Sequence, residues 1–424
     1  MKKIVSLFIV LLALIALLII WPKTMPSFSP DRNYIDMEAQ ILEAFIFAKD
    51  SSTIQLPEGH FLFSQSLSLD NKKFVTIRGM GMDKTILSFK GQSQGAEGLK
   101  ITNSENIIIE ELGIEDAIGD NIKISDTDTL TIRNIRSAWT GKVSTANGAY
   151  ALYPVLCSQV LIEGCEAIGS SDAGIYVGQS ENVVVRNNKA YYNVAGIESE
   201  NSSHVEIYGN EVFQNTSGLL IFNLPELTVY GSNVKAHNNI IYNNNIPNFG
   251  VKGSIVSAVP KGTGVVIMAT QNVDFYDNTI KDHKTANLSV VSYEVFAAEQ
   301  DPINNTLEEA VVAQGLRTIQ SDFEADSKYN PYPGNVLIHR NKFENQFKFP
   351  TLSNDFGKLW YFKNGANIPD IAYDGILPQG IKLQDPQVKL CIQNNGEASF
   401  VYLDAANDFT NFSNDLIPFN CSVN

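Results

Sequence analysis

The sequence is short of positive charge, which limits the partners that its surface can bind. It has 31 lysines and arginines against 46 aspartates and glutamates, so its formal net charge is −15 at pH 7. A chain of this charge repels nucleic acids and anionic membrane surfaces. We therefore expect no nucleic-acid partner. An acidic polysaccharide can bind only where a local basic patch or a bound cation offsets the negative field.

Motifs of cofactor and nucleophile chemistry are missing as well. No cysteine or histidine cluster has the spacing of a metal site, and neither a glycine-rich phosphate loop nor a nucleophile elbow occurs. We therefore expect no cofactor. Calcium held by carboxylates and turn carbonyls stays open, although the sequence offers no defined loop for it.

Cysteine is scarce, with four residues in the chain. Cys391 and Cys421 lie near the C-terminus and are the pair expected to form a disulfide in an oxidising compartment. Cys157 and Cys165 flank a predicted strand at Val160–Ile162. That strand holds them farther apart than the roughly 4.4–6.8 Å between Cα atoms that a disulfide needs, so we expect buried free thiols.

One long apolar run is present, at Ile4–Ile20, and it follows Lys2 and Lys3. No small-residue cleavage site and no lipid-accepting cysteine come after it, which favours an uncleaved anchor at residues 4–21 over a cleaved signal peptide. Residues 1–23 are thus predicted to be a membrane anchor or signal segment. The body is expected outside the cytoplasm, in the periplasm or at the cell surface.

The rest of the chain repeats a short strand pattern with little helical periodicity. A second short strand precedes most of these repeats, and no helical spacing separates the two, which excludes alternating βαβ units. The pattern predicts an all-β fold, a right-handed single-stranded parallel β-helix with coils of roughly 22–23 residues. The repeats begin at Ile107, Leu130, Val160, Val183, Val205, Val234, Val273 and Val336.

Aligning the repeats places asparagine at one position just after the strand. Asparagine tolerates left-handed backbone and can bond to its neighbour in the next coil, so the column predicts a ladder at a tight turn. Cys165 takes the same position one coil earlier. The asparagines are Asn188, Asn210, Asn239, Asn278 and Asn341.

The two ends of the solenoid need covers. Apolar residues at helical spacing over Met37–Ala48 predict a capping helix, so residues 24–52 are assigned to a linker and this cap. The β-helix is assigned to residues 53–355. The coil pattern weakens after that point, and residues 356–424 are predicted to form a small β-rich capping region.

Outward positions of the first strand in each coil form a polar stripe on one face. The stripe runs Lys100, Lys123, Tyr153, Tyr176, Glu198, and long insertions on both sides of it predict a cleft. Four further polar residues are expected near this face, and we assign them with Lys100 to substrate binding. They are Asp172, Glu200, Asn201 and His283.

This stripe could support two kinds of sugar chemistry. Elimination or C5 epimerisation of a uronic acid needs Lys123 to neutralise the carboxylate, Tyr153 or Tyr176 to carry a proton, and Glu198 as base or partner. Hydrolysis instead needs two carboxylates, and Glu198 with Asp172 or Glu200 is the candidate pair. Tyrosines and lysines that simply cover a flat sheet face are the plainer interpretation.

Several segments resemble a known family. Residues 148–154 (GAYALYP), 171–180 (SDAGIYVGQS) and 194–198 (VAGIE) are similar to exported bacterial parallel β-helix repeat proteins of the pectate-lyase-like superfamily. The resemblance covers nearly all of the chain after the apolar run. It implies export and a β-helix, with more distant similarity to pectate-lyase-like enzymes, alginate C5-epimerases and the accessory β-helix protein of nitrous-oxide reductase.

Two functions follow from these observations. The first is an extracytoplasmic carbohydrate-active protein that binds an acidic polysaccharide on the first-sheet face, and eliminates or epimerises it there. The alternative is a non-catalytic envelope scaffold or maturation partner that uses the same face to bind a protein.

Overall fold

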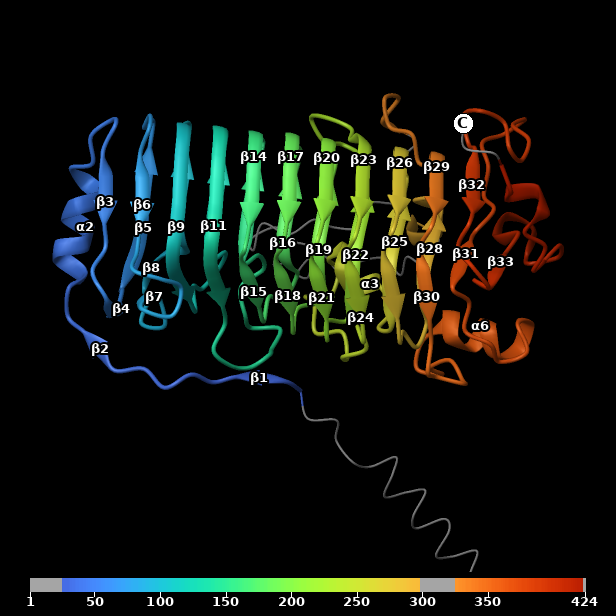
Figure 1. Ribbon diagram of the computed structural model, residues 1–424, viewed down its shortest axis with the longest axis horizontal. Helices are drawn as coiled ribbons and strands as arrows, with labels where there is room; N and C mark the ends of the chain where they lie inside the picture. The colour runs from blue at the N-terminus through green and yellow to red at the C-terminus, as the bar shows by residue number, and fades with distance from the viewer. Residues whose placement is uncertain (1–24, 298–324, 422–424) are drawn as a thin grey trace, which may run out of the picture.

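The computed structural model describes residues 25–297 and 325–421. Parallel strands stack side by side into an elongated solenoid, and successive coils follow one another from one end to the other (Figure 1). Each regular coil contributes three strands. The third strand is only three residues long, and the sequence pattern did not reveal it.

Three parallel sheets run along the solenoid. Sheet 1 has 11 strands: β5 (Gln65–Asp70), β8 (Gln94–Thr102), β10 (Ile122–Ser125), β13 (Leu152–Val155), β16 (Ala173–Gly178), β19 (Ala195–Glu200), β22 (Ser217–Phe222), β25 (Thr263–Met268), β28 (Ala286–Val291), β31 (Ile371–Tyr373) and β33 (Phe400–Tyr402).

Sheet 2 contains the repeats on which the sequence alignment rests. Its strands are β3 (Thr53–Gln55), β6 (Thr76–Arg78), β9 (Glu105–Glu115), β11 (Asp128–Ala138), β14 (Ser158–Glu163), β17 (Glu181–Arg186), β20 (Ser203–Tyr208), β23 (Ser232–His237), β26 (Gln271–Tyr276), β29 (Gly334–His339) and β32 (Leu390–Gln393).

Sheet 3 holds the short third strands, together with the C-terminal halves of β9 and β11. Its other strands are β2 (Tyr34–Ile35), β4 (Gly59–Leu62), β7 (Thr85–Ser88), β15 (Glu166–Ile168), β18 (Lys189–Tyr191), β21 (Glu211–Phe213), β24 (Ile240–Tyr242), β27 (Thr279–Lys281) and β30 (Lys342–Glu344).

The predicted register is confirmed. Leu130 pairs with Ile107 on one side and with Val160 on the other, and the same column continues through Val183 and Val205. Alternate residues of each strand point inward, where they form one apolar core along the solenoid axis. Because each coil buries its apolar face only against its neighbours, the core exists only as a stack.

The asparagine ladder is also confirmed, and it is longer than predicted. Asn188 Nδ2 donates to Asn210 Oδ1 at 3.0 Å, and the same bond repeats in each following coil until Asn395. Each side chain also donates to a backbone carbonyl, as Asn210 does to Val185. A second buried ladder runs through Asn193, Asn215 and Asn244.

The N-terminal end carries the expected helix, α2 (Glu38–Ile46), which lies at the open end of the first coils (Figure 1). Ile41 and Phe45 of this helix are buried in the core. None of the helices in the described ranges is long and apolar enough to cross a membrane. The predicted anchor at residues 4–21 lies outside these ranges.

The C-terminal boundary differs from the prediction. Strands β31, β32 and β33 continue sheets 1 and 2, so the coils extend past residue 355. The helix α6 (Asp355–Lys363) interrupts them, which is why the repeat weakens in the sequence there. The Cys391–Cys421 disulfide is confirmed, and Cys157 and Cys165 are buried free thiols.

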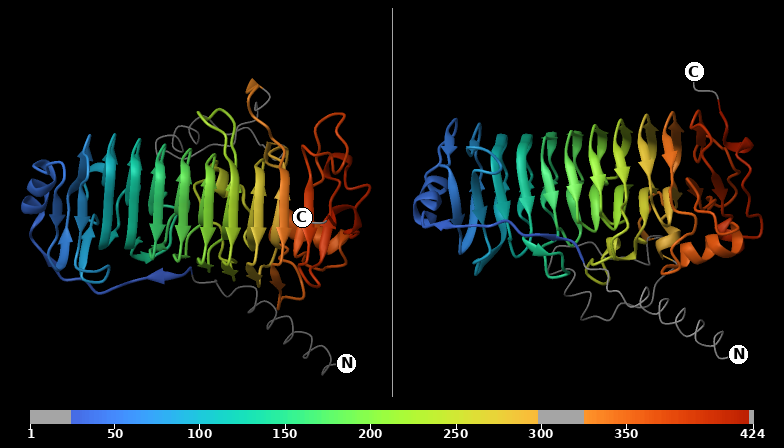
Figure 2. Two further views of the ribbon diagram at one scale, coloured as in Figure 1. Left: turned by 45° about the horizontal axis from the view of Figure 1, so that its top comes forward. Right: turned by 60° about the horizontal axis from the view of Figure 1, so that its bottom comes forward.

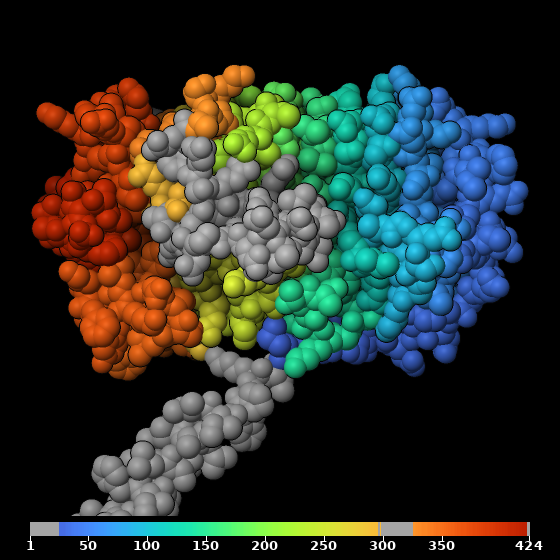
Figure 3. Space-filling model, turned by 180° about the vertical axis from the view of Figure 1, so that it is seen from behind, coloured from blue at the N-terminus to red at the C-terminus, as the bar shows by residue number. Residues whose placement is uncertain are grey.

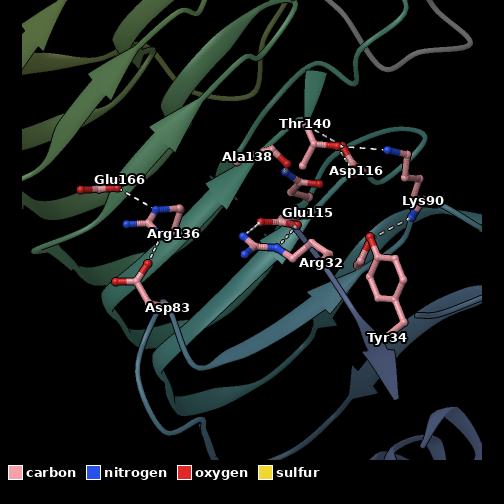
Figure 4. Close-up of polar contacts among 12 residues, drawn as sticks. Arg32, Tyr34, Asp83, Lys90, Glu115, Asp116, Arg136, Ala138, Thr140 and Glu166 are labelled. Carbon is pink, nitrogen blue, oxygen red and sulfur yellow. Dashed lines mark hydrogen bonds and ion pairs between the residues drawn. The ribbon is translucent and has the colours of Figure 1, made fainter. Parts of the chain in front are cut away.

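A strap along the flank connects α2 to the middle of the solenoid (Figure 2). Its first strand, β1 (Ser27–Phe28), pairs antiparallel with β12 (Gly141–Lys142) in the loop after β11. Arg32 of the strap donates from Nε and Nη2 to the two carboxylate oxygens of Glu115, which is fully buried (Figure 4). This ion pair fixes the strap to β9.

We expect Asn210→Ala to lower the free energy of unfolding by about 3 kcal/mol, because it leaves the Val185 carbonyl and the Asn188 amide buried without partners. Urea unfolding followed by circular dichroism measures the effect. Asn420→Ala is the matched control, since its side chain is exposed. Equal unfolding midpoints for the two variants would contradict a stabilising role of the ladder.

We expect Arg32→Ala to lower the free energy of unfolding by about 3 kcal/mol, because it leaves the buried Glu115 carboxylate without its cation. Lys73→Ala removes an exposed ion pair to Glu105 and should lower the free energy of unfolding far less. Unfolding curves compare the two variants, and limited proteolysis should show new cleavage between residues 25 and 36 in the first alone. Wild-type resistance of Arg32→Ala would disprove the anchoring role.

Candidate functional site

The predicted polar stripe exists as a column on the outer face of sheet 1. Lys123 pairs with Lys100 on one side and with Tyr153 on the other, and Tyr176 pairs with Glu198 in the next two coils. Glu200 pairs with Gly178. Strand pairing therefore gives these side chains the common direction that the sequence pattern predicted.

The stripe does not lie in an open cleft, because loops fold over it. Phe249, Ile255 and Val256 of the loop at 245–262, which contains the short helix α3 (Ile255–Ala258), pack with Tyr153 and Tyr176 in a second apolar cluster. The predicted walls of the cleft are therefore a cover.

Three tyrosine rings meet under this cover. The ring centroids of Tyr150, Tyr153 and Tyr176 lie between 4.5 and 4.8 Å from one another. Burial and the nearby Asp172 carboxylate raise the pKa of Tyr150 well above its ordinary value, so its phenol stays protonated. The trio offers apolar ring surface together with hydroxyl groups, a combination suited to sugars.

Three carboxyl groups lie beside the tyrosines, from Asp172, Glu198 and Glu200. Each of them is at most 3% exposed. Burial and repulsion from Glu200 raise the pKa of Asp172, while burial and repulsion from Asp172 and Glu200 raise the pKa of Glu198. Both groups therefore hold a proton at a pH where an exposed carboxyl has lost it.

Two of these buried atoms lack a partner. Asp172 Oδ1 and Glu198 Oε1 have no hydrogen-bond partner among the residues that the structure describes. Buried polar atoms are almost always paired in folded proteins, since an unpaired one costs about 1–3 kcal/mol. Orphan acids of this kind are typical of a site that a ligand completes. We call the three tyrosines and the three acids the acid–tyrosine cluster.

The lysines of the stripe form ion pairs with acids at one end of the cluster. Lys123 Nζ lies 3.8 Å from Asp120 Oδ2 and 4.0 Å from Glu97 Oε1, and 4.9 Å from the centre of the Tyr153 ring. Lys100 Nζ lies 3.7 Å from Glu97 Oε1. The positive charge of the stripe is therefore balanced within the protein.

Asn201 and His283 have structural contacts instead of facing the cluster. Asn201 Nδ2 donates to the carbonyls of Leu224 and Val229, which fixes the loop after β22. His283 closes the second ladder, where Nε2 accepts from Asn244 and Nδ1 donates to Asn287 Oδ1. Burial lowers the pKa of His283 to about 4, so it is neutral.

Sequence reasoning missed Tyr150 and Asp120. Both precede their strands, in turns that the repeat alignment did not include, so their direction could not be read from a column. Tyr150 nevertheless lies in the stretch at residues 148–154 that carries the family resemblance. Asp120 Oδ1 accepts from the Tyr150 backbone amide at 3.2 Å, which connects the two across neighbouring coils.

An open groove of about 660 Å³ borders the cluster at the turn between sheets 1 and 2. Gln179 and Asn201 line it, and they directly follow Gly178 and Glu200, which form a pair across the strands. Tyr230, from the loop after β22, forms one wall. The groove thus gives an extended ligand an approach to the Glu200 end of the cluster.

Within the described ranges, no group of three histidine, cysteine or carboxylate side chains is placed to hold a metal ion. The acids of the cluster do not form such a group, and the structure adds no support for a calcium site.

The family description "right handed beta helix region" matches residues 137–307, which include most strands of the cluster. The protein is a right-handed parallel β-helix. No curated protein matches the sequence.

Several solved structures share the architecture. They include the A-module of mannuronan C-5 epimerase AlgE6 from Azotobacter vinelandii (14% identity, 88% of this chain and 94% of that one, TM-score 0.47). Another is DFA-IIIase from Arthrobacter chlorophenolicus A6 (11% identity, 82% of this chain and 91% of that one, TM-score 0.47). A third is the tailspike protein of Escherichia coli bacteriophage HK620 (11% identity, 82% of this chain and 64% of that one, TM-score 0.48).

We expect the protein to lose stability as pH rises from 5 to 8. Burial raises the pKa of Asp120 to about 7, above its unfolded value, so its contribution is present at low pH and is lost as pH rises through the folded pKa. Asp120→Asn, which cannot ionise, should reduce the difference in unfolding free energy between pH 5 and 8 by roughly 2–3 kcal/mol.

Urea unfolding at the two pH values measures this difference. Some pH dependence of the unfolding free energy will remain in Asp120→Asn, because burial also raises the pKa of Asp374 to about 7. An Asp120→Asn variant with the full wild-type pH dependence would show that Asp120 does not titrate in this range.

Proposed function

We propose that this protein is a carbohydrate-active β-helix protein that binds a glycan at the acid–tyrosine cluster and cleaves a glycosidic bond there. The protonated carboxyl groups of Asp172 and Glu198 carry the proposal, because each lies beside the three tyrosine rings and has one buried oxygen atom without a partner in the described ranges. A protonated carboxylic acid can donate its proton to a leaving sugar oxygen, and the tyrosine rings can stack on the sugar.

The charges favour hydrolysis over the elimination or C5 epimerisation of an acidic polysaccharide. Both of those reactions rely on Lys123 to neutralise a uronic acid, and its charge is already balanced by Asp120 and Glu97. Hydrolysis needs an acid and a second carboxylate. Glu198 serves as the acid in this proposal, and Glu200 serves as the second carboxylate, because the Asp172 carboxyl is protonated.

Access requires the cover to be displaced locally. The groove at the turn between sheets 1 and 2 is open, and Asn201, which lines it, directly follows Glu200 in the chain. A glycan chain lying in this groove would need part of the apolar cover to shift before its sugar units reached Tyr176 and Glu198. Exclusion of water after binding would then strengthen the electrostatic contacts of the bound sugar.

The apolar cover is also the observation that favours the alternative, a scaffold that binds an envelope protein. In that case the cluster is never exposed to a glycan, and the same face binds the protein through the cover that packs on Tyr176. The sequence-based proposal of an exported, membrane-anchored protein is compatible with both functions. A pull-down from envelope extracts with the wild type and Tyr176→Ala distinguishes them, because a glycan-processing protein needs no stable protein partner.

We expect Glu198→Gln to lower turnover of a cleaved glycan at least about a hundredfold, since it removes the proton donor without changing the size of the side chain. The assay incubates the full chain with neutral glucans and with alginate, pectin and glycosaminoglycans. Reducing ends report hydrolysis, and ultraviolet absorbance reports the unsaturated products of elimination. Glu58→Gln, at an exposed position far from the cluster, is the matched control.

Unsaturated products would show that the reaction is elimination and not hydrolysis, although the acid–tyrosine cluster would still be the site. The absence of both binding and cleavage over the whole panel would reject the carbohydrate proposal and leave the scaffold.

A further inference from the structure

Aromatic and basic side chains gather at one edge of the solenoid, where sheet 3 turns into sheet 1. A pocket of about 330 Å³ at this edge is lined by Lys261, Lys284 and Lys348, together with Phe347 and Phe349. Lys284 Nζ lies 4.6 Å from the centre of the Phe347 ring. Of these residues, Lys348 and Phe349 are exposed to solvent.

Large apolar side chains next to this pocket face solvent. Phe349 is 69% exposed, Leu352 55%, Tyr361 47% and Phe362 79%. The last two belong to α6, which ends at Lys363, and the exposed aspartate of this helix, Asp355, is paired with Lys358 at 2.7 Å. We call Lys261, Lys284, Lys348 and Lys363 with Phe349, Leu352, Tyr361 and Phe362 the basic–aromatic edge.

The N-terminal strap begins on the same edge. Strand β1 pairs with β12 in the loop after the sheet 3 part of β11, and the basic–aromatic edge follows β24, β27 and β30 in the same sheet. Six coil spacings of about 4.8 Å separate β11 from β30, or roughly 30 Å. Figures 1 and 3 show the start of the strap and α6 along one edge.

We propose that the basic–aromatic edge rests on the surface of an anionic phospholipid bilayer. Aromatic rings and lysines are the side chains that occupy the interface between lipid and water, with the ring inserted and the ammonium group at the headgroups. Each lysine near an anionic surface strengthens binding about fivefold. Acids on the other faces do not cancel this attraction, because charges more than about 8 Å away are screened at physiological salt. Asp282 and Asp355 lie at the edge itself and reduce the attraction, Asp355 less because it is paired with Lys358.

The apolar run at residues 4–20 brings the edge to that surface. The chain enters the described structure at Met25, which packs against the cover of sheet 1, and Pro26 accepts from the Val143 amide. A segment inserted in the bilayer therefore holds the edge at a high effective concentration near the lipid. Because the strap and the basic–aromatic edge are separated by roughly 30 Å along one edge, the solenoid axis lies along the membrane plane.

This proposal is independent of the glycan chemistry. The test uses the full chain in nanodiscs, with an environment-sensitive fluorophore on a cysteine that replaces Phe362. Labelling is selective because Cys157 and Cys165 are buried and the other two cysteines are paired. The control carries the label in place of Lys235, which is exposed on the outer face of sheet 2.

We expect a blue shift of the Phe362→Cys label in nanodiscs of phosphatidylglycerol and phosphatidylcholine, compared with phosphatidylcholine alone. The Lys235→Cys label should not shift. Adding Lys348→Glu and Lys363→Glu should remove the shift, and the fold should tolerate both changes because the two side chains are exposed.

Three results would overturn the proposal. One is the same emission of the Phe362→Cys label in both kinds of nanodisc, and another is a shift that survives both charge reversals. The third is a shift that soluble alginate causes and phosphatidylglycerol does not, which would make the edge a glycan-binding site.

Discussion

The buried asparagine ladders hold the coils in register, and every other feature of the molecule depends on that register. A strand that slips by one residue turns its apolar side chains outward and its polar ones inward. Each ladder asparagine bonds to the next asparagine and to a backbone carbonyl, so neighbouring coils fit together in one alignment only. The columns on the outer faces are a consequence of this alignment.

The ladders also explain how the fold can contain a site that lowers its stability. The acid–tyrosine cluster buries carboxyl groups that repel one another, and two of its oxygen atoms have no partner in the described chain. Such a cluster destabilises the coils that carry it. The ladder members Asn193 and Asn215 lie in the same coils as Asp172 and Glu198, and their bonds offset part of that cost. The site is therefore compatible with the fold because the neighbouring turns are saturated with hydrogen bonds.

The fold could be predicted from the sequence because its signals are local and repeated. Val160, Val183 and Val205 recur with the spacing of one coil, and the asparagine column marks the turn after each strand. The site was predicted only in part. The direction of Tyr176 and Glu198 follows from strand alternation, but their burial comes from loops that have no repeat, and no column indicates where a loop folds.

The surroundings of His283 could not be predicted from the sequence either. It was expected near the polar stripe, yet a histidine in a turn can face either solvent or the core. The neighbours that decide this, Asn244 and Asn287, act through side-chain bonds that the spacing of residues does not reveal. Likewise the C-terminal coils were placed outside the β-helix because α6 interrupts their spacing, although Asn395 still extends the ladder.

Net charge was a poor guide to the surfaces of this protein, for a physical reason. Many of its acids are already neutralised, some by arginine across neighbouring strands as Glu110 is by Arg78 and Arg133, and others by protonation under the cover of sheet 1. Their charge therefore contributes little to the field at a distance. A bound partner senses only what lies within a Debye length of its own surface. One edge rich in lysine can thus attract an anionic surface although the chain as a whole is acidic.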